Sequence, residues 1–160
     1  MPLHVTLRMA PHVYNLRSRR SFRVIAAALR IGGDRFDVRV VEFSIQGNHI
    51  HLVVEAPNRR GLARAIQGLS IRVAKGLNRM MGRSGRVFDD RYHARLLRTP
   101  TEVRHALRYV LDNARKHAAE RGEIYGPGYV DPYSSAGAPE LAMPPAQTWL
   151  LRTGWKRAGP

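Results

Sequence analysis

Cysteine is absent from this chain of 160 residues. Disulfide bonds, thiolate nucleophiles and zinc sites built on cysteine are therefore excluded. Long hydrophobic runs are also missing, since no apolar stretch approaches the length that spans a bilayer and the start of the chain has no apolar signal core. The sequence therefore predicts a cytoplasmic protein with no membrane partner.

Negative charge is scarce as well. The chain has 12 Asp and Glu residues against 27 Lys and Arg residues, which gives a formal net charge of +15. A compact domain of this charge repels itself unless it meets a polyanion, so nucleic acid is the expected partner. Almost all of the basic residues are arginine. A high-GC genome also produces such a bias, and composition alone leaves that alternative open.

The hydrophobic pattern predicts one α+β domain. Apolar and polar residues alternate as in β-strands at 3–9, 37–46, 49–56 and 86–99. Helical periodicity and end signals predict helices at 18–33, 60–82 and 101–122. Up to residue 99 the order is βαββαβ, which is typical of a ferredoxin-like antiparallel sheet with helices on one face. The last predicted helix is appended to that unit.

The last part of the chain has a different composition. Residues 123–160 are rich in Pro, Gly and Ser and show no periodicity, apart from a short apolar patch that contains Trp149 and Trp155. We therefore expect a domain at 1–122 followed by an irregular tail that docks on it at one point or more.

Two histidines stand out in the segment QGNHIHLVVE. Because strand side chains alternate between faces, His49 and His51 share one face of the predicted strand, roughly 6.6 Å apart along it. Two imidazoles at this spacing can bind one metal ion. A pair of surface or hydrogen-bonded core histidines is the alternative, and a metal site needs further ligands.

The helix predicted at 101–122 carries candidates for the remaining roles. Tyr109 and Asn113 are four residues apart, so they are neighbours on one helix face. Asn113 offers a neutral oxygen ligand, and Tyr109 offers a phenolic nucleophile. Such a pair is also common in helices that carry no site.

Three segments together give a resemblance to a known family. They are His49-Ile50-His51 after a Gly-Asn turn, the later strand GRVFDDRYHARLL and the helix LRYVLDNARKH. Over about residues 1–122 the chain resembles the HUH-type single-strand tyrosine transposases, and most closely their REP-associated branch. It departs from the family pattern at Ala114, where members often carry a proline, and at Val87-Phe88, where many carry a tryptophan.

The resemblance implies an endonuclease and strand transferase that cuts and rejoins single-stranded or hairpin DNA through a 5′-phosphotyrosine intermediate. Tyr109 would be the nucleophile. A divalent ion, Mg²⁺ or Mn²⁺, would be held by His49, His51 and Asn113. The expected assembly is a monomer, or a homodimer that exchanges the helix carrying Tyr109.

Basic side chains at the predicted helices 18–33 and 60–82 are expected to neutralise DNA phosphates. They are Arg17, Arg19, Arg20, Arg23, Arg59, Arg60, Arg64, Lys75, Arg79 and Arg83.

The alternative function is a non-catalytic nucleic-acid-binding protein. An RNA-binding ferredoxin-like domain stacks bases on exposed aromatic residues of its central strands, and the segment HIHLVVE has none. A transposase that has lost its activity would be expected to lose the tyrosine or one of the three metal ligands, and the chain retains all four of these residues.

Overall fold

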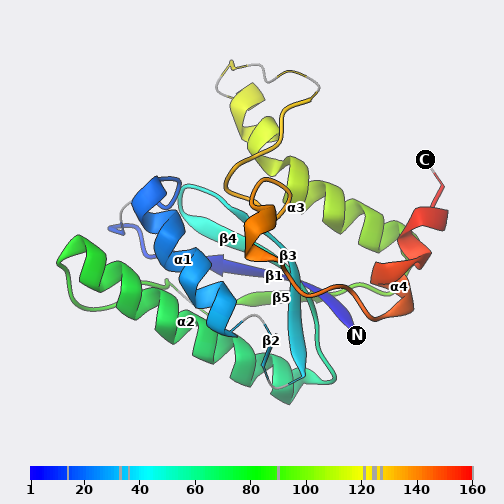
Figure 1. Cartoon of the computed structure of the whole chain (residues 1–160), viewed down its shortest axis with the longest axis horizontal. Coiled ribbons are helices and arrows are strands. Elements are labelled where there is room, and N and C mark those ends of the chain that lie inside the picture. Colours follow the sequence, from blue (N-terminus) through cyan, green and yellow to red (C-terminus); the bar gives the residue numbers. More distant parts are fainter. Residues whose placement is uncertain are drawn as a thin grey trace.

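The computed structural model describes residues 1–13, 15–32, 34–35, 37–89, 91–120, 122–123, 126 and 128–159. Their centre is one antiparallel sheet with the spatial strand order β2-β3-β4-β1-β5 (Figure 1). The strands are β1 (Pro2–Arg8), β2 (Asp34–Arg35), β3 (Val38–Ile45), β4 (His49–Glu55) and β5 (His93–Leu96). Without the two-residue β2 at one edge, this is the predicted ferredoxin-like order, and the α+β fold class is confirmed.

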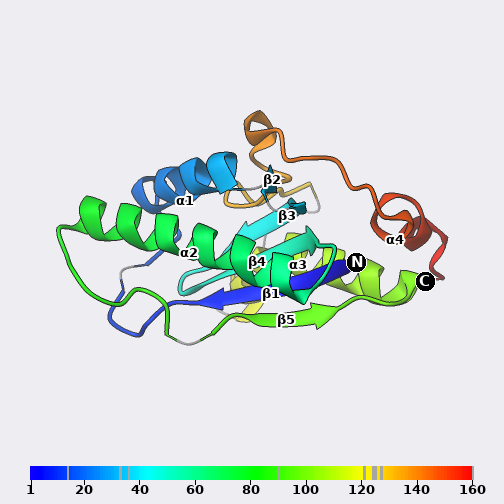
Figure 2. The same ribbon diagram turned by 90° about the horizontal axis from the view of Figure 1, so that it is seen from below.

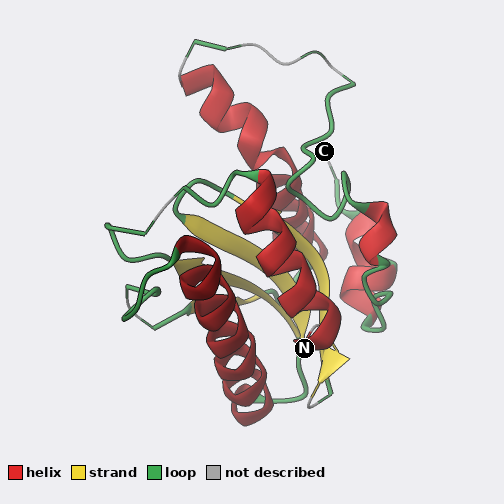
Figure 3. Cartoon of the chain, turned by 60° about the vertical axis from the view of Figure 1, so that its left-hand side comes forward, coloured by secondary structure: helices red, strands yellow, loops and turns green. Residues whose placement is uncertain are grey.

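Helices cover both faces of the sheet. The helices α1 (Arg19–Gly32) and α2 (Arg59–Met81) lie over one face, while α3 (Pro100–Glu120) lies over the other (Figure 3). The residues of β4 alternate accordingly: Ile50, Leu52 and Val54 belong to the core under α1 and α2, whereas Val53 belongs to a smaller core under α3. None of the described helices has an apolar stretch of membrane-spanning length.

The structure shortens the fourth predicted strand. Only His93–Leu96 pairs with β1, and Phe88 forms no more than an isolated bridge to Met9. The helix that follows begins at Pro100, one residue earlier than predicted. Thr99 is its cap, because its hydroxyl accepts the N–H of Glu102 at 3.1 Å. Proline fits the first turn of a helix, where its missing N–H is not needed.

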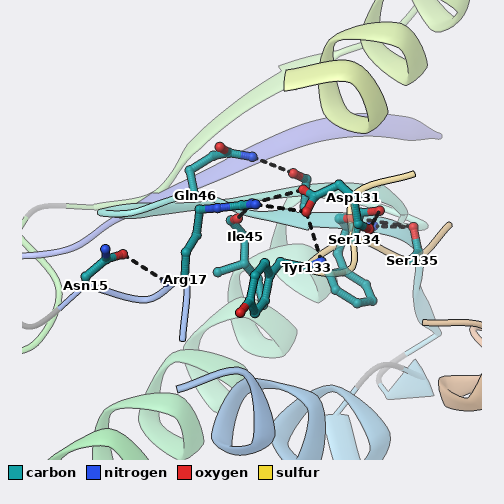
Figure 4. A network of polar contacts seen from close by, with 10 residues as sticks. Asn15, Arg17, Ile45, Gln46, Asp131, Tyr133, Ser134 and Ser135 are labelled. Carbon is teal, nitrogen blue, oxygen red and sulfur yellow. Dashed lines mark hydrogen bonds and ion pairs between the residues drawn. The ribbon is translucent and has the colours of Figure 1, made fainter. Parts of the chain in front are cut away.

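The segment after α3 docks on the domain at several points. The Arg17 guanidinium donates two hydrogen bonds of 3.0 Å to the Asp131 carboxylate and a third of 3.0 Å to the carbonyl of Ile45 (Figure 4). The backbone N–H of Ser135 donates to the carbonyl of Phe43 in β3. The chain then runs past β3 to the beginning of α3 (Figure 2). It forms η1 (Pro139–Leu141), α4 (Trp149–Arg152) and η2 (Gly154–Arg157) on the way.

A buried carboxylate holds the later part of this segment. Glu55, which is 1% exposed, accepts the backbone N–H groups of Gln147 at 2.8 Å and Thr148 at 2.5 Å. Arg39 Nε lies 3.1 Å from the same carboxylate. Burial acts to raise the pKa of Glu55, but the hydrogen bonds from Thr148, Gln147 and Arg39 outweigh it and the pKa is lowered.

We expect Glu55→Gln to reduce the free energy of unfolding by about 1–3 kcal/mol, because it removes hydrogen bonds to a charged acceptor. The pKa is lower in the folded state, so this stability is present above the unfolded-state pKa and is lost as the pH falls through the folded-state pKa. Wild type and variant should therefore converge in acid. Urea unfolding at several pH values measures the difference, with the exposed Glu140→Gln as a control that should change nothing. Equal stability of Glu55→Gln and wild type at neutral pH would contradict the assignment.

Candidate active site

The histidine pair lies on the face of β4 that α3 covers. Antiparallel pairing sets Arg8 opposite His49 and Thr6 opposite His51, so the polar side of β1 borders the pair. The ring centroids of His49 and His51 are 4.7 Å apart and the rings are perpendicular. His51 is buried, with 3% of its surface exposed, and His49 is half-buried. The two imidazoles thus form one cluster, as their spacing in the sequence predicts.

The helix α3 brings Tyr109 to this cluster. The ring of Tyr109 lies 5.1 Å from the ring of His51, edge to face at 86°. It is 42% exposed, so a ligand can reach it. Lys116 Nζ lies 5.8 Å from the centre of the same ring. A phenol, two imidazoles and a nearby ammonium group therefore meet at one place on the surface.

Asn113 lies one helical turn beyond Tyr109 on the same face of α3. Its side chain is 2% exposed, and neither its amide oxygen nor its amide nitrogen has a hydrogen-bond partner among the described residues. A buried amide without partners costs about 1–3 kcal/mol, and folded proteins rarely keep one without a ligand or a water molecule. The side chain thus fits a residue whose partner is a bound group.

The tautomer of His49 follows from its neighbour. Asn48 Oδ1 lies 2.6 Å from His49 Nδ1. A carbonyl oxygen can only accept, so Nδ1 carries the proton and the lone pair of the neutral ring is on Nε2. This is the arrangement of a histidine that presents Nε2 to an electrophile or a metal ion.

A third histidine joins the cluster from β1. His4 Nε2 lies 3.1 Å from His51 Nδ1, and the ring of His4 is 5.6 Å from that of Tyr109. Burial lowers the pKa of His4, and Arg95 on β5 lowers it further. The sequence analysis missed His4. The alternation of β1 shows that its side chain is on the polar side of the strand, but only the pairing of β1 with β4 shows what it faces.

The donor set suits a divalent cation. Within the described ranges, no three His, Asp or Glu side chains are grouped as a metal centre requires. Two imidazoles and the amide oxygen of Asn113 could complete one with water, and the unsatisfied amide supports that role. Such mixed nitrogen and oxygen ligands do not discriminate sharply between Mg²⁺ and Mn²⁺.

Most of the basic residues predicted to bind phosphates, Lys75 included, lie on the other side of the sheet from Tyr109. The candidates on α1 and α2 cover the face of the sheet opposite α3, and therefore opposite Tyr109 (Figure 3). Arg17 is held in the ion pair with Asp131. Exposed basic residues on the histidine face include Arg8 of β1 and Arg95 of β5, which the sequence analysis did not single out.

A hollow of about 650 Å³ between α1 and the docked tail is separate from this cluster. Its lining includes Arg19, Phe22, Arg23 and Tyr133. It lies on the α1 side of the sheet, so it contributes nothing to the chemistry at Tyr109.

The comparisons with known proteins agree with this fold. A family model described as "Transposase IS200 like" matches residues 13–113. The fold is similar to that of a REP-associated tyrosine transposase bound to a REP hairpin, with a TM-score of 0.62, 14% identity, and coverage of 84% of this chain and 75% of that one. It is also similar to a chain from Deinococcus radiodurans R1 that is provisionally described as a transposase. That match has a TM-score of 0.51, 11% identity, and coverage of 78% and 92%. Among curated proteins, none matches this chain significantly.

The fold and the family match define a transposase domain. The chain belongs to the IS200-like transposase family, whose model spans more than half of its length and ends at Asn113. The family assignment made from the sequence is thereby confirmed. At their low identities, the two solved structures add the fold alone.

Proposed function

We propose that this protein cuts single-stranded DNA and rejoins it by transesterification at Tyr109. The observation that carries the proposal is the contact of the Tyr109 ring with His51, in a cluster that also contains His49. The unsatisfied amide of Asn113, one helical turn from Tyr109, supports it. A tyrosine on a rigid helix beside paired imidazoles is suited to attack a phosphodiester, because the reacting atoms are held in place.

The step is a phosphoryl transfer that conserves the energy of the bond. The phenolic oxygen of Tyr109 loses its proton and forms a bond to phosphorus, and the bond from phosphorus to the 3′ oxygen breaks. That oxygen takes up a proton in place of the one that Tyr109 lost, so no proton is gained or lost overall, and it leaves as a free 3′-OH. The DNA downstream stays attached to Tyr109 through its 5′-phosphate. Attack by another 3′-OH on this ester reverses the step and joins a new strand.

His49, His51 and Asn113 would hold a divalent cation, Mg²⁺ or Mn²⁺. When bound, such an ion supplies Lewis-acid stabilisation of negative charge on the phosphoryl oxygens. His49 is prepared for this role, because Asn48 fixes its proton on Nδ1. Asn113 would contribute a neutral oxygen, and the burial of its side chain restricts the direction in which that oxygen points.

We further propose a hairpin with a single-stranded flank as the DNA substrate. The solved structure of a REP-associated tyrosine transposase, which shares this fold, contains a REP hairpin. The formal charge of +15 suits a polyanion, and Arg8 and Arg95 provide positive charge on the same face as the histidines.

The direct test is a covalent-adduct assay. Hairpin oligonucleotides with randomised single-stranded flanks, labelled at the 5′ or the 3′ end, are incubated with protein and Mn²⁺, Mg²⁺ or EDTA and then resolved under denaturing conditions. We expect an adduct that retains the 3′ label, releases the 5′-labelled fragment and disappears with EDTA. If neither ion gives an adduct with any flank, binding without catalysis explains the fold and the charge instead.

Binding of the hairpin should weaken steeply with salt. For single-stranded contacts, the logarithm of affinity falls with the logarithm of salt concentration by about 0.7 per phosphate neutralised. We expect Arg95→Ala to reduce this slope by about that amount, because one phosphate contact is lost. Arg60→Ala on α2, on the opposite face, serves as the matched comparison. Fluorescence anisotropy between low and high salt measures both slopes. A larger change for Arg60→Ala would move the DNA path to the α1–α2 face.

A further inference from the structure

Three aromatic rings, one each from β1, β4 and α3, lie close to one another. The rings of His4 and His51 are 5.2 Å apart, those of His51 and Tyr109 are 5.1 Å apart, and those of His4 and Tyr109 are 5.6 Å apart. His4 is thus the one described residue of β1 whose ring touches both a proposed metal ligand and the proposed nucleophile. Its position precedes residues 13–113, which the family model matches.

The contact between His4 and His51 has two possible proton arrangements. His4 Nε2 and His51 Nδ1 are 3.1 Å apart, so one of them donates and the other accepts. If His51 donates, its own lone pair is on Nε2 and can bind a cation. If His4 donates, His51 carries its proton on Nε2 and can only offer a hydrogen bond there.

We propose that His4 is a positioning residue that accepts the Nδ1–H of His51 and thereby fixes the tautomer of His51 that can bind a metal ion. The metal-binding part of this inference rests on the proposed function. The tautomer itself does not, because it is a property of the free protein.

The geometry of the neighbouring ligand supports this direction. Asn48 fixes His49 with its proton on Nδ1, because the amide oxygen can only accept. A cation held by both imidazoles needs the same tautomer at His51, and His4 Nε2 is placed to accept the Nδ1–H of that tautomer. Metal-binding histidines commonly donate their second N–H to such a fixed acceptor, which also orients the ring.

Thr6 is the competing acceptor for the same proton. Its hydroxyl oxygen lies 3.3 Å from His51 Nδ1, which is longer than the contact with His4 and beyond the usual range of about 2.7–3.2 Å for a hydrogen bond. Thr6 and His4 can each donate or accept, so the shorter contact favours His4 as the partner of His51 Nδ1. His4 in addition touches Tyr109, so one side chain orients both the ligand and the nucleophile.

The tautomer is measured directly by long-range ¹H–¹⁵N NMR of the histidine rings in metal-free protein. In wild type we expect His51 with its proton on Nδ1. His4→Phe keeps an aromatic ring against Tyr109 but removes the acceptor, so His51 should change to a mixture of tautomers. His4→Gln restores an acceptor oxygen and should restore the Nδ1–H form. Thr6→Val and the exposed His12→Phe should leave His51 unchanged. A wild-type His51 protonated on Nε2 would overturn the proposal without any variant.

Affinity for Mn²⁺, measured from the free-ion EPR signal without DNA, gives a second readout. Loss of the hydrogen-bond partner that orients a metal-binding side chain typically weakens metal binding by about 10–100-fold. We expect a loss in that range for His4→Phe and recovery for His4→Gln. A His4→Phe protein that binds Mn²⁺ as tightly as wild type would refute the positioning role. If the tautomer responds as expected and no form of the protein binds Mn²⁺, the metal site of the proposed function fails and the role of His4 stands.

Discussion

Tyr109→Phe should eliminate the covalent protein–DNA adduct and leave hairpin binding intact. The substitution removes only the phenolic oxygen. The ring itself stays in place, so its contacts with the rings of His51 and His4 remain. Loss of a nucleophile removes the step that depends on it, so we expect strand cleavage to fall by about 10³-fold or more. The adduct assay and fluorescence anisotropy, run on the same hairpin, separate cleavage from binding.

Tyr133→Phe is the matched control for this experiment. Tyr133 is also partly buried, but it packs against Phe22 on the α1 side of the sheet and under the guanidinium of Arg17. Removing its hydroxyl should leave the adduct unchanged. If Tyr109→Phe still forms the adduct, Tyr109 has a structural role only. If Tyr133→Phe loses the adduct, the reacting group lies in the docked tail.

Local patterns were sufficient to predict most of the elements. The alternation in HIHLVVE predicts β4 and places its two histidines on one face, and the structure agrees. The helix predicted at 60–82 is observed at Arg59–Met81, because single residues set both of its ends. Asn58 caps its first turn, and Gly82 takes the left-handed conformation (φ 64°) that ends it.

Long-range features were not readable from the same patterns. β3 contains a bulge between Val40 and Glu42, which moves Glu42 to the α3 face and away from the main core. β5 is short because only His93–Leu96 pairs with β1. Pairing between two distant segments is not visible in the local pattern of either one. Glu55 reads as a strand residue on a polar face, yet the distant segment at Gln147 buries it.

The residues of the candidate site also fall into those that local patterns reveal and those that only long-range pairing reveals. His49, His51, Tyr109 and Asn113 were candidates because their spacing within one strand or one helix is visible in the sequence. His4 was missed because it meets His51 diagonally across two strands that are far apart in the chain. The basic residues of α1 and α2 were candidates for phosphate contacts because of their charge and their place on the helices, and neither feature shows on which side of the sheet a helix packs.

Asn113→Leu should make the protein more stable and impair its metal-dependent cleavage. Both polar atoms of the Asn113 amide are buried without a partner among the described residues, and leucine has a similar shape without that cost. We expect the free energy of unfolding to rise by about 1–3 kcal/mol. For a chain of this size, the thermal midpoint should rise by about 2–4 °C for each kcal/mol. Thermal unfolding without metal, together with the adduct assay, measures both effects.

The opposite result is expected for another asparagine in the chain. Asn78 donates to the carbonyl of Gly85 at 2.9 Å and accepts from Arg83 at 2.6 Å, so Asn78→Leu breaks satisfied hydrogen bonds and should lower stability without touching the site. A third measurement tests the ligand role. A cation that binds only the folded protein raises its unfolding midpoint by mass action. Mn²⁺ should therefore stabilise wild type and Asn78→Leu, but Asn113→Leu far less. If Asn113→Leu lowers stability and keeps its response to Mn²⁺, the amide is a structural group and the third ligand must be found elsewhere.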